Sequence, residues 1–216
     1  MSGRNKTNAS EKPTAMETFK EYAQAIILAV VLALFVRSFV MQAFHIPSGS
    51  MIPTFLEGDR VLVNKFVYGI RNPLTNGILI ETGQPERWDV VVFIAPKEKD
   101  KDFVKRVIGL PGETVAIEGG QLFINGVKME DPHARYYNTA VPVSSRTFGP
   151  VMVKENEYFM MGDNRDNSSD SRVWGGVDVS LLKGKAWRLY WSWDSDDPDL
   201  SFFDRFRGSR IGTRIE

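Results

Sequence analysis

The sequence predicts a mainly β protein: an antiparallel β-sheet domain with a small inserted cap, preceded by one N-terminal transmembrane helix. Three observations predict this fold. A single long apolar run lies near the N-terminus. After it, short runs of β-branched and aromatic residues are separated by Gly, Pro and Asn-Gly turn signals, which is typical of antiparallel strands and not of a parallel α/β protein. With 43% hydrophobic and 12% aromatic residues, the chain can also bury a sizeable core.

Composition excludes several classes of site. The 216 residues suffice for one medium domain plus an appendage, or for two small domains. Lys+Arg and Asp+Glu are both 27, and this balance argues against a nucleic-acid binder, which normally carries a basic excess. No cysteine is present, so disulfides, thiolate metal sites and a cysteine nucleophile are excluded.

The apolar run predicts a membrane anchor over residues 22–43, after a short polar tail over residues 1–21. From Tyr22 to Met41 the run has 20 residues, enough to cross roughly 30 Å of hydrocarbon as a helix, and Arg37 can extend to the headgroups. A cleavable signal peptide and a buried core helix are the alternatives. The positive-inside rule places the N-terminus in the cytoplasm and residues 44–216 outside it, because four basic residues precede the run: Arg4, Lys6, Lys12 and Lys20.

The remaining chain is predicted to form strands joined by tight turns. The strands are expected at 60–68, 89–94, 103–110, 115–117, 121–124 and 157–161, with hairpin turns at Gly119-Gly120 and Asn125-Gly126. Weak periodicity at about 128–150 indicates the inserted cap. In the last strand Trp187, Leu189, Trp191 and Trp193 alternate, which favours a core-packed aromatic face over one that rests on the bilayer interface.

Residues 44–54, which read FHIPSGSMIPT, form the connector between the apolar run and the first strand. Prolines bracket this stretch and disfavour helix, while Gly49 permits unusual backbone geometry. The stretch therefore predicts a rigid, irregular loop that presents a serine hydroxyl. Taken alone, Ser, Gly and Pro are also ordinary loop residues.

A serine nucleophile needs a base, and neither histidine is well placed to be one. His45 is too close to Ser50 along an extended loop, and His133 lies in the weakly periodic region, so a Ser-His-Asp triad is disfavoured. Neither histidines nor carboxylates cluster as metal ligands do, and an EF-hand register starting at Asp163 or Asp166 lacks the required Gly and Glu. That polar stretch is interpreted as a turn whose charged side chains pair among themselves: Asp163, Arg165, Asp166, Asp170 and Arg172.

Lys105 is the remaining candidate base. In a strand it shares a face with Phe103 and Val107, and apolar neighbours would desolvate its ammonium group. A pKa near 8 needs a shift of roughly 2.5 units, which burial can supply, and a neutral lysine can deprotonate a serine. The alternative is that Lys105 is exposed and Arg106 points inward.

Five motifs in order resemble bacterial type I signal peptidase. Between residues 44 and 176 they read IPSGSMIPT, GDRVLVNKFVYGIR, RWDVVVF, FVKRVIGLPGE and GDNRDNSSDSRVWG, and the preceding anchor and following GKAW also fit. The resemblance implies that Ser50 is the nucleophile and Lys105 its general base, that Ser48 and the Ser50 N–H form the oxyanion hole, and that Ser168 orients the lysine. It also implies a supporting ion-pair network of Arg106, Asp170 and Arg172.

The same resemblance implies the activity. The expected enzyme is a signal peptidase of the cytoplasmic membrane, which needs no cofactor or metal and cleaves exported preproteins after small residues at −1 and −3. The matched pocket residues are Phe44, Ile46, Met51, Phe103 and Val104. Phe55 and Phe103 depart from the usual Leu and Tyr and leave the pocket size open. The alternatives are a non-catalytic β module that binds extended peptides, and a self-cleaving regulator, against which the membrane span argues.

Overall fold

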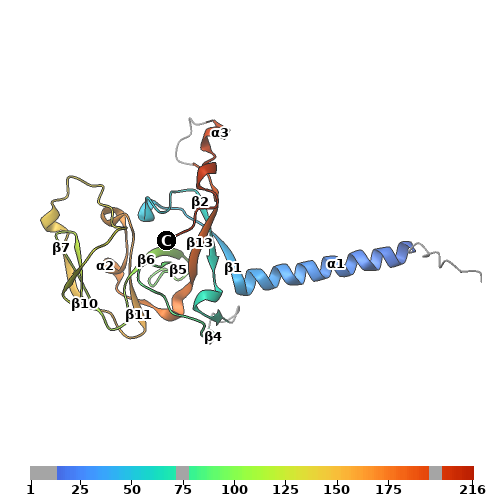
Figure 1. Cartoon of the computed structure of the whole chain (residues 1–216), viewed down its shortest axis with the longest axis horizontal. Coiled ribbons are helices and arrows are strands. Elements are labelled where there is room, and N and C mark those ends of the chain that lie inside the picture. The colour runs from blue at the N-terminus through green and yellow to red at the C-terminus, as the bar shows by residue number, and fades with distance from the viewer. Residues whose placement is uncertain (1–13, 72–77, 195–200) are drawn as a thin grey trace, which may run out of the picture. The chain divides into compact units, whose positions relative to one another are not determined.

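The computed structural model describes residues 14–71, 78–194 and 201–216 (Figure 1). The chain divides into two compact units, one ending at Ser38 and the other running from Phe39 to Glu216. Most of the predicted tail, residues 1–13, lies outside the described residues.

The N-terminal unit contains one long helix, α1, over Ala15–Phe35. It begins seven residues before the predicted start because Thr14 and Glu17 form a capping box, in which each side chain accepts a hydrogen bond from the other's backbone N–H. None of its residues is buried, so a core helix is excluded. Among the described residues, Ala15–Ser38 is the one helical stretch long and apolar enough to cross a membrane.

The predicted end of the anchor is wrong. A π-helical turn occupies Val36–Val40, and strand β1 then runs over Met41–His45, so residues 41–43 belong to a sheet. The register pairs Met41 with Asn64 and His45 with Arg60 of the next strand, β2 (Asp59–Asn64). Hydrophobicity alone could not reveal this boundary, because apolar residues suit a buried strand as well as a membrane helix.

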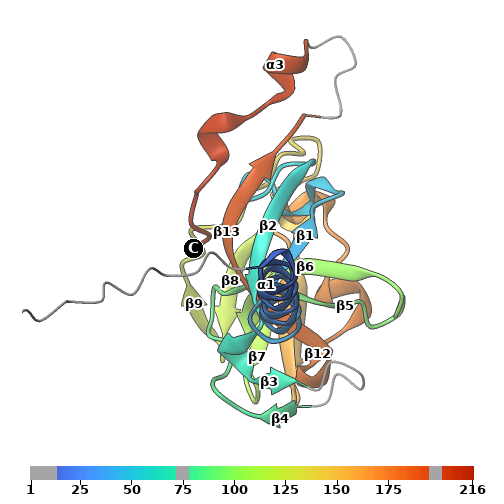
Figure 2. The same ribbon diagram turned by 90° about the vertical axis from the view of Figure 1, so that its right-hand side faces the viewer.

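A seven-stranded antiparallel sheet forms the larger part of the second unit, which confirms the predicted fold class. Its order is β1-β2-β13-β5-β6-β11-β12, and β13 runs beside β2 along most of its length (Figure 2). The bounds beyond β1 are β2 Asp59–Asn64, β5 Val90–Ile94, β6 Asp102–Gly109, β11 Glu157–Met161, β12 Val177–Asp178 and β13 Leu182–Ser192. A short β3–β4 hairpin (Ile70–Arg71, Ile78–Ile80) and two one-turn helices, α2 Ser171–Trp174 and α3 Phe202–Arg205, complete the unit.

The inserted cap is larger than predicted. A separate four-stranded sheet has the order β10-β7-β8-β9, and its strands are β7 Thr114–Glu118, β8 Gln121–Ile124, β9 Val127–Met129 and β10 Phe148–Met152. Both predicted hairpin turns are confirmed, with positive φ at Gly119, Gly120, Asn125 and Gly126. The insertion therefore spans Thr114–Met152. The weak periodicity at 128–150 identified mainly the irregular connection between β9 and β10.

The predicted core face of β13 is wrong for two of its tryptophans. Trp187 and Trp191 are 42% and 39% exposed, whereas Leu189 between them is buried. Irregularities in the register with β2 fall between Ala186 and Arg188 and between Leu189 and Trp191. Each β-bulge shifts the alternation by one residue, so side chains two apart no longer share a face.

Candidate active site

The serine-bearing connector folds as a tight turn after β1. Gly49–Met51 forms one turn of 3-10 helix, and Ser50 is buried with 8% of its surface exposed. Met51 next to it is fully buried in the core cluster that includes Ile46 and Val61. The Phe55 N–H donates to the Met51 carbonyl at 2.9 Å. The backbone at Ser50 is thus fixed because the adjacent Met51 packs into the core.

Lys105 projects from β6 to the same point. Its Nζ donates a hydrogen bond to Ser50 Oγ at 2.7 Å and to the Val104 carbonyl at 3.0 Å. Only 4% of the residue is exposed, and the Phe103 ring lies 5.6 Å from Nζ. Burial lowers the pKa of Lys105 to about 8, while the charges of Asp170 and Asp163 act in the opposite direction. Of the two alternatives left open by the sequence, the buried Lys105 is the one found, and its pKa is shifted in the direction that burial predicts.

Arg106 is buried as well. The sequence suggested that only one of Lys105 and Arg106 would be buried, but both are. Its guanidinium forms a bidentate pair with Asp163, with Nε–Oδ1 at 2.8 Å and Nη2–Oδ2 at 2.7 Å, and both side chains are fully buried. Nη1 donates to the carbonyls of Trp88 and Glu216, both at 2.7 Å. Hydrogen-bond acceptors therefore surround the guanidinium, and the Asp163 carboxylate compensates its charge.

The expected network of Arg106, Asp170 and Arg172 is two separate ion pairs. Asp170 accepts two hydrogen bonds from the Arg172 guanidinium, each at 2.8 Å, one from the Arg172 main-chain N–H at 3.3 Å, and one from the Gly162 N–H at 3.1 Å. The prediction that the charges of this loop pair among themselves thus holds for Asp170 and Arg172. The other three bind partners outside the loop: Asp163 with Arg106, Arg165 with Asp131, and Asp166 with Arg146. Local spacing could not predict these pairs, because their partners come from β6 and from the β9–β10 connection.

Ser168 does not make the expected hydrogen bond to Lys105. Its Oγ is buried and has no partner among the residues that the structure describes. It nevertheless lies close to the serine loop, because a Cβ placed on Gly162 would come well under 3.0 Å from both Ser168 Oγ and the Ser50 carbonyl. Ser48, by contrast, is exposed. Ser48 lines the cavity in front of Ser50, whereas Ser168 lies near the serine loop without a hydrogen bond to Lys105.

A cavity of about 580 Å³ opens in front of Ser50 and Lys105, a volume in the usual range for a ligand site. Four of the five predicted pocket residues line it: Phe44, Ile46, Phe103 and Val104. Met51 does not, since it is buried in the core beneath the loop. Phe55 is also fully buried, so its departure from Leu does not alter the cavity wall, whereas that of Phe103 does.

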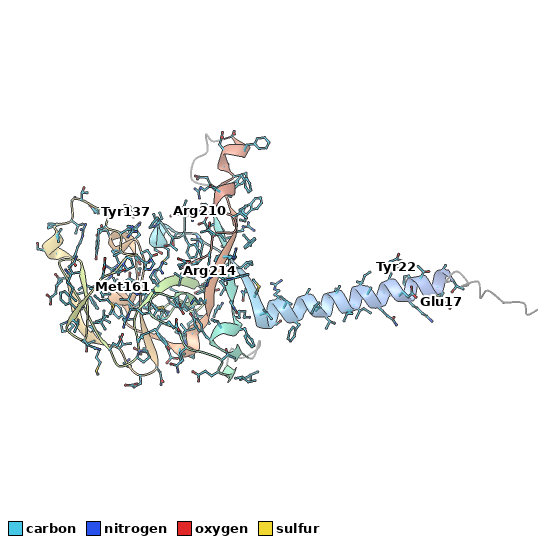
Figure 3. All side chains as sticks on the ribbon, viewed as in Figure 1. Glu17, Tyr22, Tyr137, Met161, Arg210 and Arg214 are labelled. Carbon is cyan, nitrogen blue, oxygen red and sulfur yellow. The ribbon has the colours of Figure 1, made fainter. Side chains whose placement is uncertain are left out.

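Sequence reasoning missed three contributors from the loop after β11, which follows Met161 (Figure 3). Asn167 and Ser169 line the cavity, and Asn164 holds the backbone of the serine loop. The Gly-Asp-Asn run at 162–164 contained a signal for the last role. Asn side chains at turns commonly bond to backbone groups, but nothing local identified the acceptor.

This arrangement suits acyl transfer. A hydroxyl bonded to a buried amine can attack a carbonyl once the amine is neutral and accepts its proton. Burial keeps that amine's pKa low, and the cavity in front of it is lined mainly by apolar surface.

Comparisons with known proteins agree with this chemistry. Residues 19–191 match the family model described as signal peptidase, peptidase S26. Signal peptidase I of Pseudomonas fluorescens is 37% identical over 225 residues, which cover 89% of this chain and 78% of the relative. Signal peptidase I S of Bacillus subtilis is 39% identical over 168 residues, which cover 76% and 83%. This chain therefore belongs to the signal peptidase I family of serine peptidases, peptidase S26.

Proposed function

We propose that this signal peptidase removes N-terminal signal peptides from exported preproteins by a Ser50–Lys105 dyad, and that it cleaves after small residues at −1 and −3. The observation that carries the proposal is the 2.7 Å contact between Lys105 Nζ and Ser50 Oγ, two side chains that are both buried. With a pKa of about 8, a substantial fraction of Lys105 is neutral near physiological pH, and a base in that range is efficient.

The proposed reaction has two halves. Neutral Lys105 takes the proton of Ser50 Oγ as that oxygen attacks the carbonyl carbon, and the resulting oxyanion accepts hydrogen bonds from the Ser50 N–H and Ser48 Oγ. Lys105 then donates the proton to the leaving amine, which departs as the mature N-terminus. In the second half Lys105 deprotonates a water that attacks the acyl carbon of the acyl-enzyme. As the ester bond breaks, Lys105 returns that proton to Ser50 Oγ, and the signal peptide leaves with a free carboxyl group.

Two free strand edges support binding of an extended substrate. Residues 102–105 of β6 pair with β5 on one side, and within the described residues no strand pairs with them on the other. Strand β1 is the first strand of the sheet order and, among the described strands, pairs with β2 alone. A substrate strand can therefore bond to free backbone groups. Phe44, Ile46, Phe103 and Val104 line the cavity, and in this proposal they form the wall that selects small side chains.

We further propose that α1 anchors the enzyme in the cytoplasmic membrane. The helix is long and apolar enough to span the bilayer, and the basic residues before it favour a cytoplasmic N-terminus. The second unit would then lie on the extracytoplasmic side, where the cleavage sites of preproteins emerge.

The decisive test is incubation of the purified chain with a preprotein in detergent, followed by N-terminal sequencing of the product. Ser50→Ala, Lys105→Ala and Lys105→Arg should each lower kcat/KM by at least about 10³-fold, since a guanidinium does not deprotonate. Wild-type kcat/KM should rise as the pH passes about 8, because Lys105 loses its proton there.

Exposed matched residues serve as controls. Ser144→Ala and Lys97→Arg should process the preprotein as the wild type does. Undiminished turnover by Ser50→Ala would overturn the dyad. Binding of the preprotein without any product from the wild type would instead support a non-catalytic peptide-binding module.

A further inference from the structure

Asn164 makes two hydrogen bonds to the backbone that carries the nucleophile, and the mechanism above assigns it no task. Its main-chain N–H donates to the Ser50 carbonyl at 3.1 Å. Its side-chain Nδ2 donates to the Gly49 carbonyl, also at 3.1 Å. The residue is 6% exposed, so both bonds are shielded from water.

The Nδ2 bond acts on a particular peptide group. The Gly49 carbonyl and the Ser50 N–H belong to the same peptide unit, which is trans. In a planar trans peptide the C=O and N–H point in opposite directions. The Gly49 oxygen also accepts from the Ile52 N–H at 3.2 Å within the turn. The bond from Asn164 adds a second restraint that holds this oxygen on the side of Asn164 and directs the Ser50 N–H away from it. The Asn164 N–H to the Ser50 carbonyl restrains the following peptide in the same way.

Asn164 itself is held from the other side of its loop. The Asn167 N–H donates to the Asn164 carbonyl at 3.1 Å, and Arg165 Nε donates to the Gly162 carbonyl at 3.0 Å. Arg165 also forms a buried ion pair with Asp131 of the inserted cap. These contacts make the Asn164 backbone a fixed support, so that a bond from it can hold the serine loop in place.

The side-chain oxygen of Asn164 shows that the amide is directed by this one contact. Oδ1 is buried and has no partner among the described residues. A buried polar atom without a partner costs free energy, and an apolar residue of similar size would avoid that cost. Reversing the amide would bring Oδ1 against the Gly49 oxygen, and the two acceptors would repel. The Nδ2 bond to Gly49 is thus the interaction for which an amide is required here.

From these contacts we infer that Asn164 is a positioning residue of the oxyanion hole, which orients the Ser50 N–H toward the developing oxyanion. The inference rests on the proposed function, in which that N–H is one of the two donors. Asn164 does not touch the substrate in this role. It acts through the Gly49–Ser50 peptide.

Two substitutions test the inference. Asn164→Ala removes the Nδ2 donor and keeps the main-chain bond, whereas Asn164→Asp keeps the shape but places a carboxylate against the Gly49 carbonyl. We expect kcat for preprotein cleavage to fall about 10- to 100-fold in Asn164→Ala and further in Asn164→Asp, with KM changed by less than about threefold, since an oxyanion-hole donor acts in the transition state. Asn156→Ala, at an exposed asparagine, is the matched control and should equal the wild type.

A pair of inhibitors separates positioning from general loosening of the site. A substrate-based peptide aldehyde adds reversibly to Ser50 Oγ and places an oxygen where the oxyanion forms, while the corresponding peptide alcohol only occupies the cavity. Asn164→Ala should weaken the aldehyde at least about 10-fold and leave the alcohol within about twofold. A purely structural role would weaken both inhibitors equally.

Failure of the Asn164 inference can be told apart from failure of the proposed function. If the wild type cleaves and Ser50→Ala does not, but Asn164→Ala keeps the wild-type kcat and aldehyde affinity, the inference is overturned and the dyad remains. If both Asn164 variants lose the folded state, or lose both inhibitors equally, Asn164 supports the fold and not the oxyanion hole, which also overturns it. Failure of the wild type to cleave would reject the proposed function itself.

Discussion

Lys105 and Arg106 are consecutive residues of β6, both buried, and the protein accommodates their charges in opposite ways. Arg106 lies between Asp163, two backbone carbonyls and Thr54, and its charge is kept and paired. Lys105 forms no ion pair with any described residue, and burial shifts its pKa downward. A strand that buries both faces can hold a fixed cation on one and a titratable amine on the other.

Replacing Lys105 by methionine should stabilise the protein in a pH-dependent way. The pKa of Lys105 falls from its ordinary 10.5 to about 8 on folding. Below pH 8 the lysine is charged in both states and its burial costs about 3 kcal/mol, whereas above pH 10.5 it is neutral in both and the cost vanishes. We therefore expect Lys105→Met to raise the free energy of unfolding by about 3 kcal/mol at pH 7, and this gain should fade between pH 8 and 10.5.

Urea unfolding at several pH values, followed by tryptophan fluorescence, measures this difference. Lys97→Met, at an exposed position, is the control and should show no such pH dependence. A Lys105→Met variant less stable than the wild type at pH 7 would show that the hydrogen bonds of Nζ outweigh the cost of its burial.

At the scale of elements, the strands were predictable where one face alone is buried or where a turn signal stands at their end. β8 and β11 have the predicted bounds, and Asn125-Gly126 gave the β8–β9 hairpin. The errors have tertiary causes. β1 could not be told from the end of the apolar run, and the two bulges of β13 exposed Trp187 and Trp191. Bulges depend on partner strands, so the local pattern does not contain them.

The segment after α3 is another element that local pattern did not predict. It runs beside β13 in the space beyond the end of β5: the Leu189 N–H donates to the Thr213 carbonyl and the Ile215 N–H to the Trp187 carbonyl, both at 3.0 Å. Ile215 joins the same core cluster as Met51. Further back, Arg210 (Figure 3) pairs with the fully buried Asp59.

Because Ile215 is part of the core cluster that contains Met51 of the serine loop, its truncation should destabilise the fold. We expect Ile215→Ala to lower the free energy of unfolding by about 2–4 kcal/mol, the usual loss for a buried isoleucine. Ile211→Ala, at a residue of the same segment that is 41% exposed, should lower it by less than about 1 kcal/mol. Urea unfolding of the two variants side by side measures the difference, and equal losses would contradict the placement of Ile215 in the core.

At the scale of the whole molecule, the site is assembled from three distant segments: the loop after β1, strand β6, and the loop after β11. The motif resemblance indicated all three and the candidate dyad, because each motif is a short run with its own residue pattern. It did not give the partners of Arg106 and Arg165 or the position of Met51. These depend on how β6, the inserted cap and the core pack together, which no single motif encodes.

All of the candidate site lies within residues 39–216, and this has a consequence for the role of α1. No residue of α1 is buried, so its removal takes nothing from the core. We expect a fragment that begins at Phe39 to cleave a soluble peptide with a kcat within about threefold of the full chain. Its processing of preproteins embedded in vesicles should fall at least 10-fold, because the anchor raises the local concentration of enzyme at the membrane.

Both assays should use the same detergent-solubilised full chain as reference, with Ser50→Ala of the fragment as the blank. Loss of peptide cleavage together with loss of the folded state would mean that α1 stabilises the second unit despite its exposure. Equal vesicle rates for the fragment and the full chain would mean that the exposed Trp187 and Trp191 of the second unit suffice for membrane contact, since Trp is favoured at the bilayer interface. The comparison therefore separates anchoring by the helix from adsorption by the sheet domain.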